Sequence, residues 1–592
     1  MDQIQTNVLL KNWRRLLPIA MAAISFIILL PLTRIEFDRH HDGYMLAQAI
    51  AIHDGAVVHR DVFAQYGPVT PWLQSLALYL PLGPALAIRV LNAAFIALTI
   101  YLLADIGRKR ATFSPITYSA GLFAATAWFV LSDVLIGVTM LPWPSTLAAC
   151  VSVASLYFLI RALGYVNGDF HKRARIYALL SGALLGVLLF TKINVGAYTI
   201  IAMFIGLTVL EWKSKVFSQR LLPYVAAGSI IIFLGIFSYL QMCGAWDSYI
   251  SQAVLWPLEW SGSGGSSLSQ IIEFGKLLSP QALPVFLVGL VIAIQCKRRG
   301  KPTERFRPWL YTACTLLVGV FVILIENRSY FDTSQSIGYL LKPNTLFLQL
   351  TIFNYDYLNF FIALVIASII SIVLISLWRL LRHQMHLERF GYWLLLTGVA
   401  GAGAYTVIPR WDPRHVWWAL PVGMLLLGTT LSKSRITWRI SRNPLWLPIF
   451  AICFMAVFST LGTLGHGPLR KGWDESPSTL ITAGMLLSHD NLNAMVEDQR
   501  LINKYIGDGK LAVFLVPDGD LSVLSGKYQS IDAAFVDWGI EFDLQARLRN
   551  KPVVVAYGLN PATLPNTTKV ALRDYELREM NGRLMIFIPK PS

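Results

Sequence analysis

Runs of apolar residues recur along this 592-residue chain and are separated by short polar stretches. Each run is roughly 18 to 22 residues long, the length at which a helix crosses the hydrocarbon core of a bilayer. The pattern predicts about thirteen spans, which begin near residues 16, 88, 115, 143, 174, 193, 221, 278, 308, 357, 391, 414 and 444. We therefore predict an all-α polytopic membrane domain over residues 1–465.

The pattern changes after the last predicted span. Residues 466–592 are polar and predict a small α/β domain. An amphipathic helix is expected over 494–506 and buried strands over 511–516 and 552–556, and Asn581-Gly582 favours a hairpin turn. Nothing in this domain has a catalytic spacing, so we interpret it as a lid or an acceptor-docking module.

The distribution of cations sets the predicted orientation. With a cytoplasmic N-terminus, the seven predicted cytoplasmic segments total 88 residues and hold 26 of the 50 Lys and Arg. The opposite loops total 141 residues and hold 9 Lys and Arg against 13 Asp and Glu. Cytoplasmic loops carry an excess of Lys and Arg. This predicts a multi-pass protein of the inner (plasma) membrane with an extracytoplasmic C-terminal domain.

Composition excludes several classes of protein. Hydrophobic residues make up 55% of the chain and charged residues only 14%, against about a quarter charged in soluble domains. The net charge of +16 lies mainly in short loops and so reflects topology rather than a nucleic-acid partner. The five cysteines are scattered without a CxxC pair, which argues against a disulfide framework or a thiolate metal site.

The first outer loop, 34–70, holds the densest group of acids and histidines. Asp42 precedes an amphipathic stretch, and a helix N-terminus there would favour its ionised form, so Asp42 is the candidate proton acceptor. His41 beside it could join a divalent cation, although the histidine spacing matches no known zinc pattern. The structural alternative is a solvated loop whose acids and histidines satisfy one another.

Cations on the same side of the membrane suggest a binding site for a lipid phosphate. Lys192 lies in a very short turn, where a charge near hydrocarbon is costly without a partner. A second turn combines guanidinium, imidazole and indole groups suited to phosphate: Arg410, Trp411, Arg414 and His415. Snorkelling and a local ion pair are the structural alternatives. Two further candidates at span ends are Asp133 and Arg89.

The first outer loop resembles that of a known family. An acidic residue and an amphipathic helix are followed by Gly55, Arg60-Asp61 and Tyr66-Gly67-Pro68. This arrangement resembles the GT-C class of membrane glycosyltransferases, especially relatives of the protein O-mannosyltransferases and of the aminoarabinose transferases that act on lipid A. The similarity is densest over 34–110. The family usually has an Asp-Glu pair where this chain has Asp42-Gly43.

The resemblance implies transfer of a sugar from a polyprenyl-phosphate donor to an acceptor hydroxyl on a glycan, lipid or protein, at the outer face and generally with inversion. It adds Asp61 and Tyr66 to the candidate site. Two alternatives stay open: a transporter or flippase of lipid-linked saccharides, and a glycan ligase or polymerase that uses a diphosphate-linked donor. Charges concentrated at span ends, without an internal repeat, disfavour the transporter.

Overall fold

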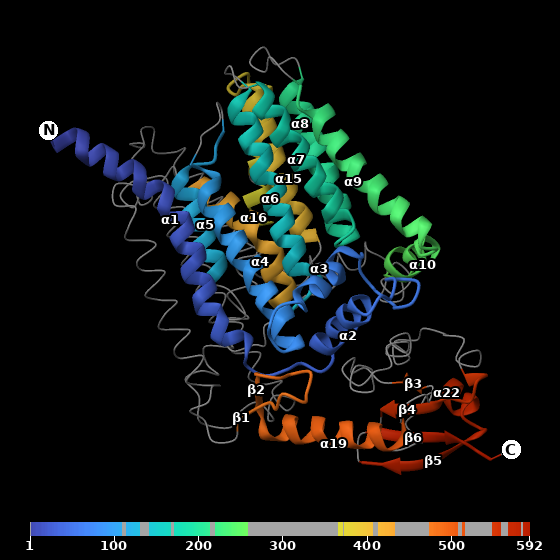
Figure 1. The fold of residues 1–592 in the computed structure, drawn as a ribbon. Coiled ribbons are helices and arrows are strands. Elements are labelled where there is room, and N and C mark those ends of the chain that lie inside the picture. Colours follow the sequence, from blue (N-terminus) through green and yellow to red (C-terminus); the bar gives the residue numbers. More distant parts are fainter. Residues whose placement is uncertain are drawn as a thin grey trace, which may run out of the picture.

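Apolar helices form a bundle whose one end carries short helices and a module with strands (Figure 1). The computed structural model describes residues 2–108, 114–130, 141–166, 171–212, 220–257, 365–366, 368–370, 372–405, 413–431, 473–506, 512–515, 548–557, 566–581 and 584–591. The bundle helices are α1 (Asp2–Thr33), α4 (Pro84–Ile106), α5 (Tyr118–Val130), α6 (Pro144–Tyr165), α7 (His171–Leu189), α8 (Ile193–Glu211), α9 (Leu222–Met242), α15 (Leu387–Tyr405) and α16 (Pro413–Leu431).

The membrane domain is confirmed in its coarse form. Five of the described helices are long and apolar enough to cross a membrane: Arg15–Thr33 of α1, α4, α6, α8 and α9. Described helices begin close to most predicted starts, but those predicted near 278, 308, 357 and 444 lie outside the described residues. The total of about thirteen spans therefore stays a prediction.

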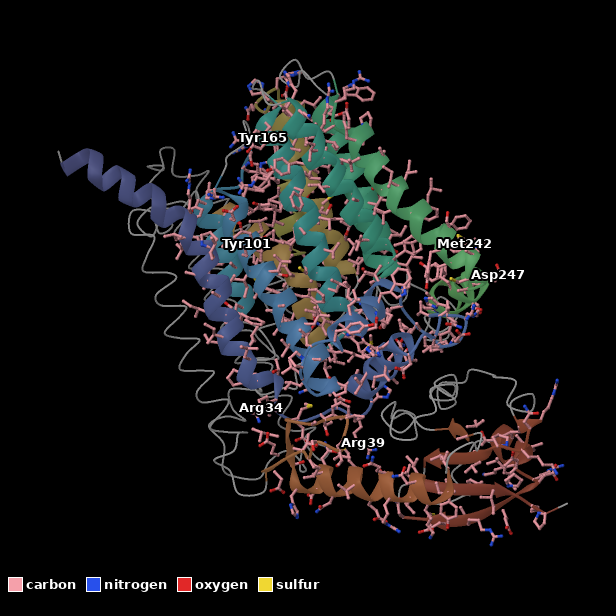
Figure 2. All side chains as sticks on the ribbon, in the orientation of Figure 1. Arg34, Arg39, Tyr101, Tyr165, Met242 and Asp247 are labelled. Atoms are coloured by element: carbon pink, nitrogen blue, oxygen red, sulfur yellow. The ribbon has the colours of Figure 1, made fainter. Side chains whose placement is uncertain are left out.

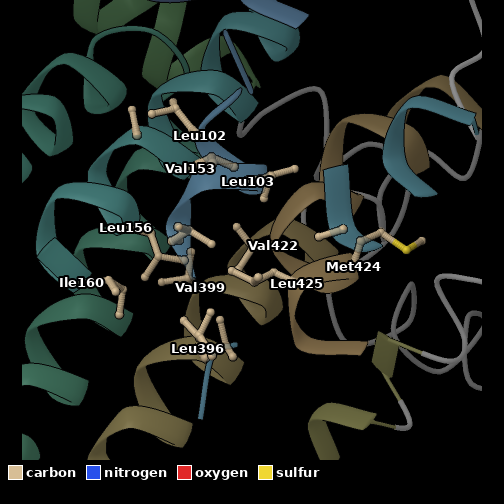
Figure 3. Close-up of a cluster of buried hydrophobic side chains, with 14 of the residues drawn as sticks. Leu102, Leu103, Val153, Leu156, Ile160, Leu396, Val399, Val422, Met424 and Leu425 are labelled. Atoms are coloured by element: carbon tan, nitrogen blue, oxygen red, sulfur yellow. The ribbon is translucent and has the colours of Figure 1, made fainter. Parts of the chain in front are cut away.

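Interdigitated aliphatic side chains from α4, α6, α15 and α16 form the centre of the bundle (Figure 3). Beside them, α5 and α16 are joined by the stacked indoles of Trp128 and Trp417, whose centroids are 4.9 Å apart. Each indole N–H donates to the other residue's backbone carbonyl at 3.0 Å. This reciprocal pairing lets two large amphipathic side chains lie in the core without an unsatisfied donor.

Several shorter elements gather at one end of the bundle. Between α1 and α4 lie α2 (His41–His53) and α3 (Val69–Ala77), and after α9 come α10 (Trp246–Tyr249) and a π-helix, η2 (Ile250–Leu255). Arg34 and Arg39 lie at this end, whereas Tyr165 lies at the other (Figure 2). The helices alternate in direction, so the described parts of the predicted cytoplasmic segments meet at the end away from α2. Which end faces the cytoplasm stays a prediction.

The C-terminal module follows its sequence pattern closely. Its first part is an antiparallel pair, β1 (Trp473–Glu475) and β2 (Leu486–Ser488), followed by α19 (His489–Tyr505). A four-stranded sheet follows in the order β3-β4-β6-β5. Its strands are β3 (Ala512–Leu515), β4 (Val553–Tyr557), β5 (Tyr575–Met580) and β6 (Leu584–Pro589), with α22 (Asn566–Ala571) before β5.

The pairing within the sheet matches the predicted strands and hairpin. β3 and β4 are parallel, with Val513 opposite Val554, while β6 is antiparallel to both β4 and β5. At the turn between β5 and β6, the backbone N–H of Leu584 donates to the Asn581 side chain at 2.8 Å. The α/β character of the module is thus confirmed, although β1 and β2 were not predicted.

Candidate functional site

The site begins where the chain leaves α1 and enters α2. Asp38 Oδ1 accepts the backbone N–H groups of His40 and His41 at 3.0 and 2.9 Å. The first N–H groups of a helix have no partner within it, so Asp38 caps α2. Its other oxygen, Oδ2, lies 2.9 Å from Nδ1 of His41.

This contact pairs the Asp38 carboxylate with the His41 imidazole. Burial favours a raised pKa for Asp38, but the hydrogen bond from His41 and the charges of His41 and His40 outweigh it and lower the pKa to about 2. In the tautomer that carries its proton on Nδ1, His41 donates to Asp38 and its Nε2 is the ring's proton acceptor. The His41 side chain is 31% exposed.

Asp42, the predicted proton acceptor, occupies a different environment. Its carboxylate and the Arg89 guanidinium on α4 form a fully buried ion pair, with Nε 3.1 Å from Oδ1 and Nη2 in contact with Oδ2. Burial raises the pKa of Asp42, and the charge of Arg89 opposes that rise. Arg89 also donates to the carbonyls of Thr33 and Ile35 at 3.2 and 2.8 Å. The pair therefore ties α2, α4 and the end of α1 together.

Trp143, at the start of α6, connects α2 to the following loop. Its indole centroid lies 5.1 Å from the His41 ring, 6.1 Å from Tyr44 and 5.6 Å from Tyr66. The contacts of His41 and Tyr66 are edge-to-face, the arrangement that aromatic quadrupoles favour. Trp143 is buried, so it fixes these rings relative to one another.

Tyr66 in turn contacts Lys192, which lies in the turn between α7 and α8. The Lys192 ammonium lies 5.7 Å from the Tyr66 ring centroid and donates to Ser145 Oγ at 2.8 Å. Gly67 explains the close approach, because a Cβ there would lie 1.8 Å from the backbone oxygen of Phe190. The chain after Tyr66 therefore packs directly on the turn that carries Lys192.

A cavity opens beside the buried Lys192 side chain. Its polar lining includes Ser145, Ser152 and His415, and Trp418 also lines it. The His415 and Trp418 rings are 5.3 Å apart, edge to face, so α16 contributes an imidazole and an indole opposite α6 and α8. Lys192 and His415 both line this cavity, and their predicted role in binding a lipid phosphate stays a prediction.

The other predicted residues divide into three groups. Arg410 and Asp133 lie outside the described residues, and of Arg414 only the backbone, at the start of α16, is described. Asp61 lies apart from the cavity lining: it binds Arg60 at 2.8 Å and accepts the Val57 N–H at 2.8 Å. Asp61 thereby closes a turn. Arg89 contacts Asp42.

A metal centre is not evident at this end of the bundle. Among the residues that the structure describes, no three His, Cys, Asp or Glu side chains gather in a way that could hold a metal ion. The candidate divalent cation beside His41 and Asp42 would compete with the bonds that these side chains make to Asp38 and Arg89.

A second histidine of the first outer loop, His59, is buried against α10 and η2. His59 Nδ1 lies 3.1 Å from the Gln252 side chain of η2, and its ring contacts Tyr249. His59 has a left-handed backbone, φ 69°, and its buried Nε2 has no hydrogen-bond partner among the described residues. Burial lowers the pKa of His59 to about 4, against the opposing hydrogen bond with Gln252.

Sequence reasoning did not select Asp38, Ser145, Trp143 or Trp418. The signal for Asp38 was its spacing of three residues before His41 at a helix start, which suits a cap that also holds a side chain. The roles of Ser145 and the two indoles depend on tertiary contacts that no local pattern encodes.

No family model matches the chain, and no curated protein sequence matches it. Among solved structures, the chain is similar to ArnT from Cupriavidus metallidurans bound to undecaprenyl phosphate, with 13% identity, a TM-score of 0.46 and 97% of both chains covered. It is also similar to the oligosaccharyltransferase of Archaeoglobus fulgidus in the apo form, with 12% identity, a TM-score of 0.48, and 92% of this chain and 69% of that chain covered.

Both proteins are GT-C glycosyltransferases, the class that the first outer loop resembles. At this level of similarity the matches transfer no substrate and no residue role to this chain.

Proposed function

We propose that this protein is a membrane glycosyltransferase that moves a sugar from a polyprenyl-phosphate donor to an acceptor hydroxyl on a lipid, glycan or protein, at the extracytoplasmic face and with inversion. The acceptor oxygen bonds to the anomeric carbon as the bond from that carbon to the phosphate oxygen breaks. The lipid phosphate leaves as an anion, and the hydroxyl proton passes to a base on the protein.

The leaving phosphate needs cations more than it needs an acid. A lipid phosphate is already a competent anion, and fixed positive charge near the departing oxygens stabilises the transition state. Lys192 supplies such a charge, since its buried ammonium lines the cavity with Ser145 as an additional hydroxyl. His415 faces the same cavity. Arg410 and Arg414, from the same turn as His415, are proposed to complete the phosphate site.

The acceptor hydroxyl needs a base, and we assign that role to His41 with Asp38 as its positioning partner. An activated base is commonly oriented by a third group through a hydrogen bond, as Asp38 orients His41 at 2.9 Å. The Asp42 carboxylate is fully buried against Arg89, so an acceptor would have to break that ion pair to reach it. The sequence prediction that Asp42 is the base is therefore the alternative to our assignment of His41.

One observation carries the proposal: Asp38, His41, Trp143, Tyr66 and Lys192 form an unbroken series of contacts that ends at the cavity. This series of contacts supports a proton acceptor at His41 and an anion site at Lys192 that are linked through packed side chains. Group transfer from a phosphate requires both functions near the reacting carbon.

The test is a transfer assay with the purified protein in detergent, radiolabelled polyprenyl-phosphate sugars and a mixture of lipid and glycan acceptors. We expect His41→Gln to lower kcat by about 10²–10⁴-fold, the usual contribution of a general base. Asp38→Asn is expected to lower kcat less, because His41 remains. His489→Gln is the matched control, since His489 forms a similar pair with Asp474 at 2.8 Å but lies 65% exposed on the module.

Asp42→Asn separates the two candidate bases. If it folds normally and loses transfer while His41→Gln stays active, Asp42 is the base and our assignment is wrong. If no polyprenyl-phosphate sugar is turned over, but labelled lipid-linked saccharide crosses reconstituted vesicles, the protein is a transporter.

A further inference from the structure

The C-terminal module binds the segment 34–39, which carries Asp38, through several hydrogen bonds. Ile35 pairs with Leu486 of β2, where the Glu36 N–H donates to the Leu486 carbonyl at 2.8 Å and the Leu486 N–H donates to the Arg34 carbonyl at 2.7 Å. The Arg34 side chain reaches the Gly484 carbonyl at 2.8 Å and Glu475 at 3.0 Å. The start of the loop is therefore joined to β2 by a single parallel β-bridge at Ile35.

The next two residues are held by α19 and its cap. The Glu36 carboxylate accepts the Ser488 N–H at 3.0 Å and the Asn491 amide at 2.8 Å, and the same amide donates to the Phe37 carbonyl at 3.1 Å. Glu36 has a left-handed backbone, φ 51°. A non-glycine residue keeps that conformation only where its surroundings impose it, and here the module supplies them.

The residue after Asp38, Arg39, forms an ion pair with Asp498 of α19. Arg39 Nη1 lies 2.6 Å from Asp498 Oδ2, and both side chains are buried. The other Asp498 oxygen accepts the Asn581 amide at 3.0 Å, which ties the pair to the turn between β5 and β6. Two buried charges in this geometry hold each other in place, because either one alone would be strongly disfavoured.

We propose that Asp498 is a positioning residue: through Arg39 it fixes the segment 34–39, and thereby the orientation of the Asp38–His41 pair during transfer. This inference rests on the proposed function. Asp38 points the other way, to the start of α2, while its neighbours on both sides are bonded to residues 473–506. A displacement of about 1 Å at a reacting group can cost about 10²-fold in rate. The module thus acts on catalysis through the position of this segment.

The test uses Asp498→Asn, Asp498→Glu and Arg39→Lys in the full-length protein. We expect Asp498→Asn to lower kcat at least tenfold while the KM for the donor stays within twofold, because the Lys192 cavity lies on other elements. Asp498→Glu keeps the charge and should recover part of the rate. Arg500→Ala is the control on α19, since Arg500 is exposed and binds Glu497 at 2.7 Å; it should leave kcat within twofold.

A readout without activity separates this inference from the proposed function. Hydrogen exchange of the peptide that spans 34–42 should speed up in Asp498→Asn and not in Arg500→Ala. Faster exchange supports the role of Asp498 in fixing the segment 34–39, even if no polyprenyl-phosphate sugar proves to be a donor. If Asp498→Asn folds and leaves exchange unchanged, or if exchange rises while kcat of an active enzyme does not change, the inference is overturned. Where Asp498→Asn does not fold, Asp498→Glu and Arg39→Lys give the same comparison.

Discussion

The buried ion pair between Asp42 and Arg89 leads to a sharp prediction about stability. Replacing Arg89 with Met leaves the Asp42 carboxylate buried without its counter-charge, and the carbonyls of Thr33 and Ile35 lose their donors. Breaking a buried pair from one side typically costs about 3–5 kcal/mol. Because burial raises the pKa of Asp42, the carboxyl can bind a proton in this variant, which limits the loss.

The double variant Arg89→Met/Asp42→Leu removes both charges. Hydrophobic replacement of a whole buried pair is often close to neutral. Here the Thr33 and Ile35 carbonyls and the Asp38 N–H, which donates to Asp42 at 2.9 Å, still lose partners. Each lost partner costs about 1–3 kcal/mol if the group stays dry. The double variant should therefore be more stable than Arg89→Met and less stable than wild type.

The assay is thermal unfolding of the purified protein in one detergent, with Arg60→Ala as the control. Arg60 forms an exposed pair with Asp61, and exposed pairs contribute little, so its midpoint should stay close to that of wild type. The order expected is wild type and Arg60→Ala, then the double variant, then Arg89→Met. An Arg89→Met midpoint equal to that of Arg60→Ala would refute the anchoring role and reopen Asp42 as a base.

Three further predictions concern the cavity cation Lys192, the close packing at Gly67 and the buried His59. Lys192→Met should raise the donor KM or lower kcat by about 10²–10³-fold, while a transfer assay with Ser145→Ala should show a smaller loss. Gly67→Ala should lower both stability and donor binding in a thermal-shift assay, because its Cβ would lie 1.8 Å from the Phe190 oxygen, whereas Gly235→Ala meets nothing within 4 Å and should be neutral or stabilising. His59 should make the fold less stable as pH falls, because its imidazole binds a proton below about pH 6.5 in the unfolded chain and only near pH 4 in the folded one. The free energy of unfolding should therefore fall by about 3 kcal/mol across that window. His59→Gln should flatten the dependence of the melting temperature on pH.

The sequence predicted the elements well because their signals are local. Apolar runs of bilayer length marked the starts of α6 and α8 near 143 and 193, and the Asn581-Gly582 dipeptide marked the hairpin between β5 and β6. In each case the pattern and the final packing depend on the same residues. The pair β1 and β2 was missed because each strand has only three residues, and because β2 is bridged by Ile35, more than four hundred residues earlier.

The site was predicted in part, for a physical reason. Lys192 and His415 were chosen by type and by their place at span ends, and they do line one cavity. Asp42 was chosen because a carboxylate at a helix start should be ionised, but the sequence could not show that Arg89, 47 residues later, would pair with it. A carboxylate that caps a helix, as Asp38 does, and one that is buried by a partner look alike in sequence.

The support of the loop 34–42 from two sides has a consequence for donor binding. Asp42 ties its end to α4 through Arg89, and Arg39 ties its middle to α19 through Asp498, so His41 lies between two buried ion pairs. A base held in this way should already be in position before the donor binds. Binding of the donor at Lys192 should therefore not move His41. We therefore expect a polyprenyl phosphate to slow hydrogen exchange around the turn 190–193 and to leave exchange of the peptide 34–42 unchanged. Equally slowed exchange in both peptides would show that the loop closes on the donor, and His41 would then not be fixed before the donor binds.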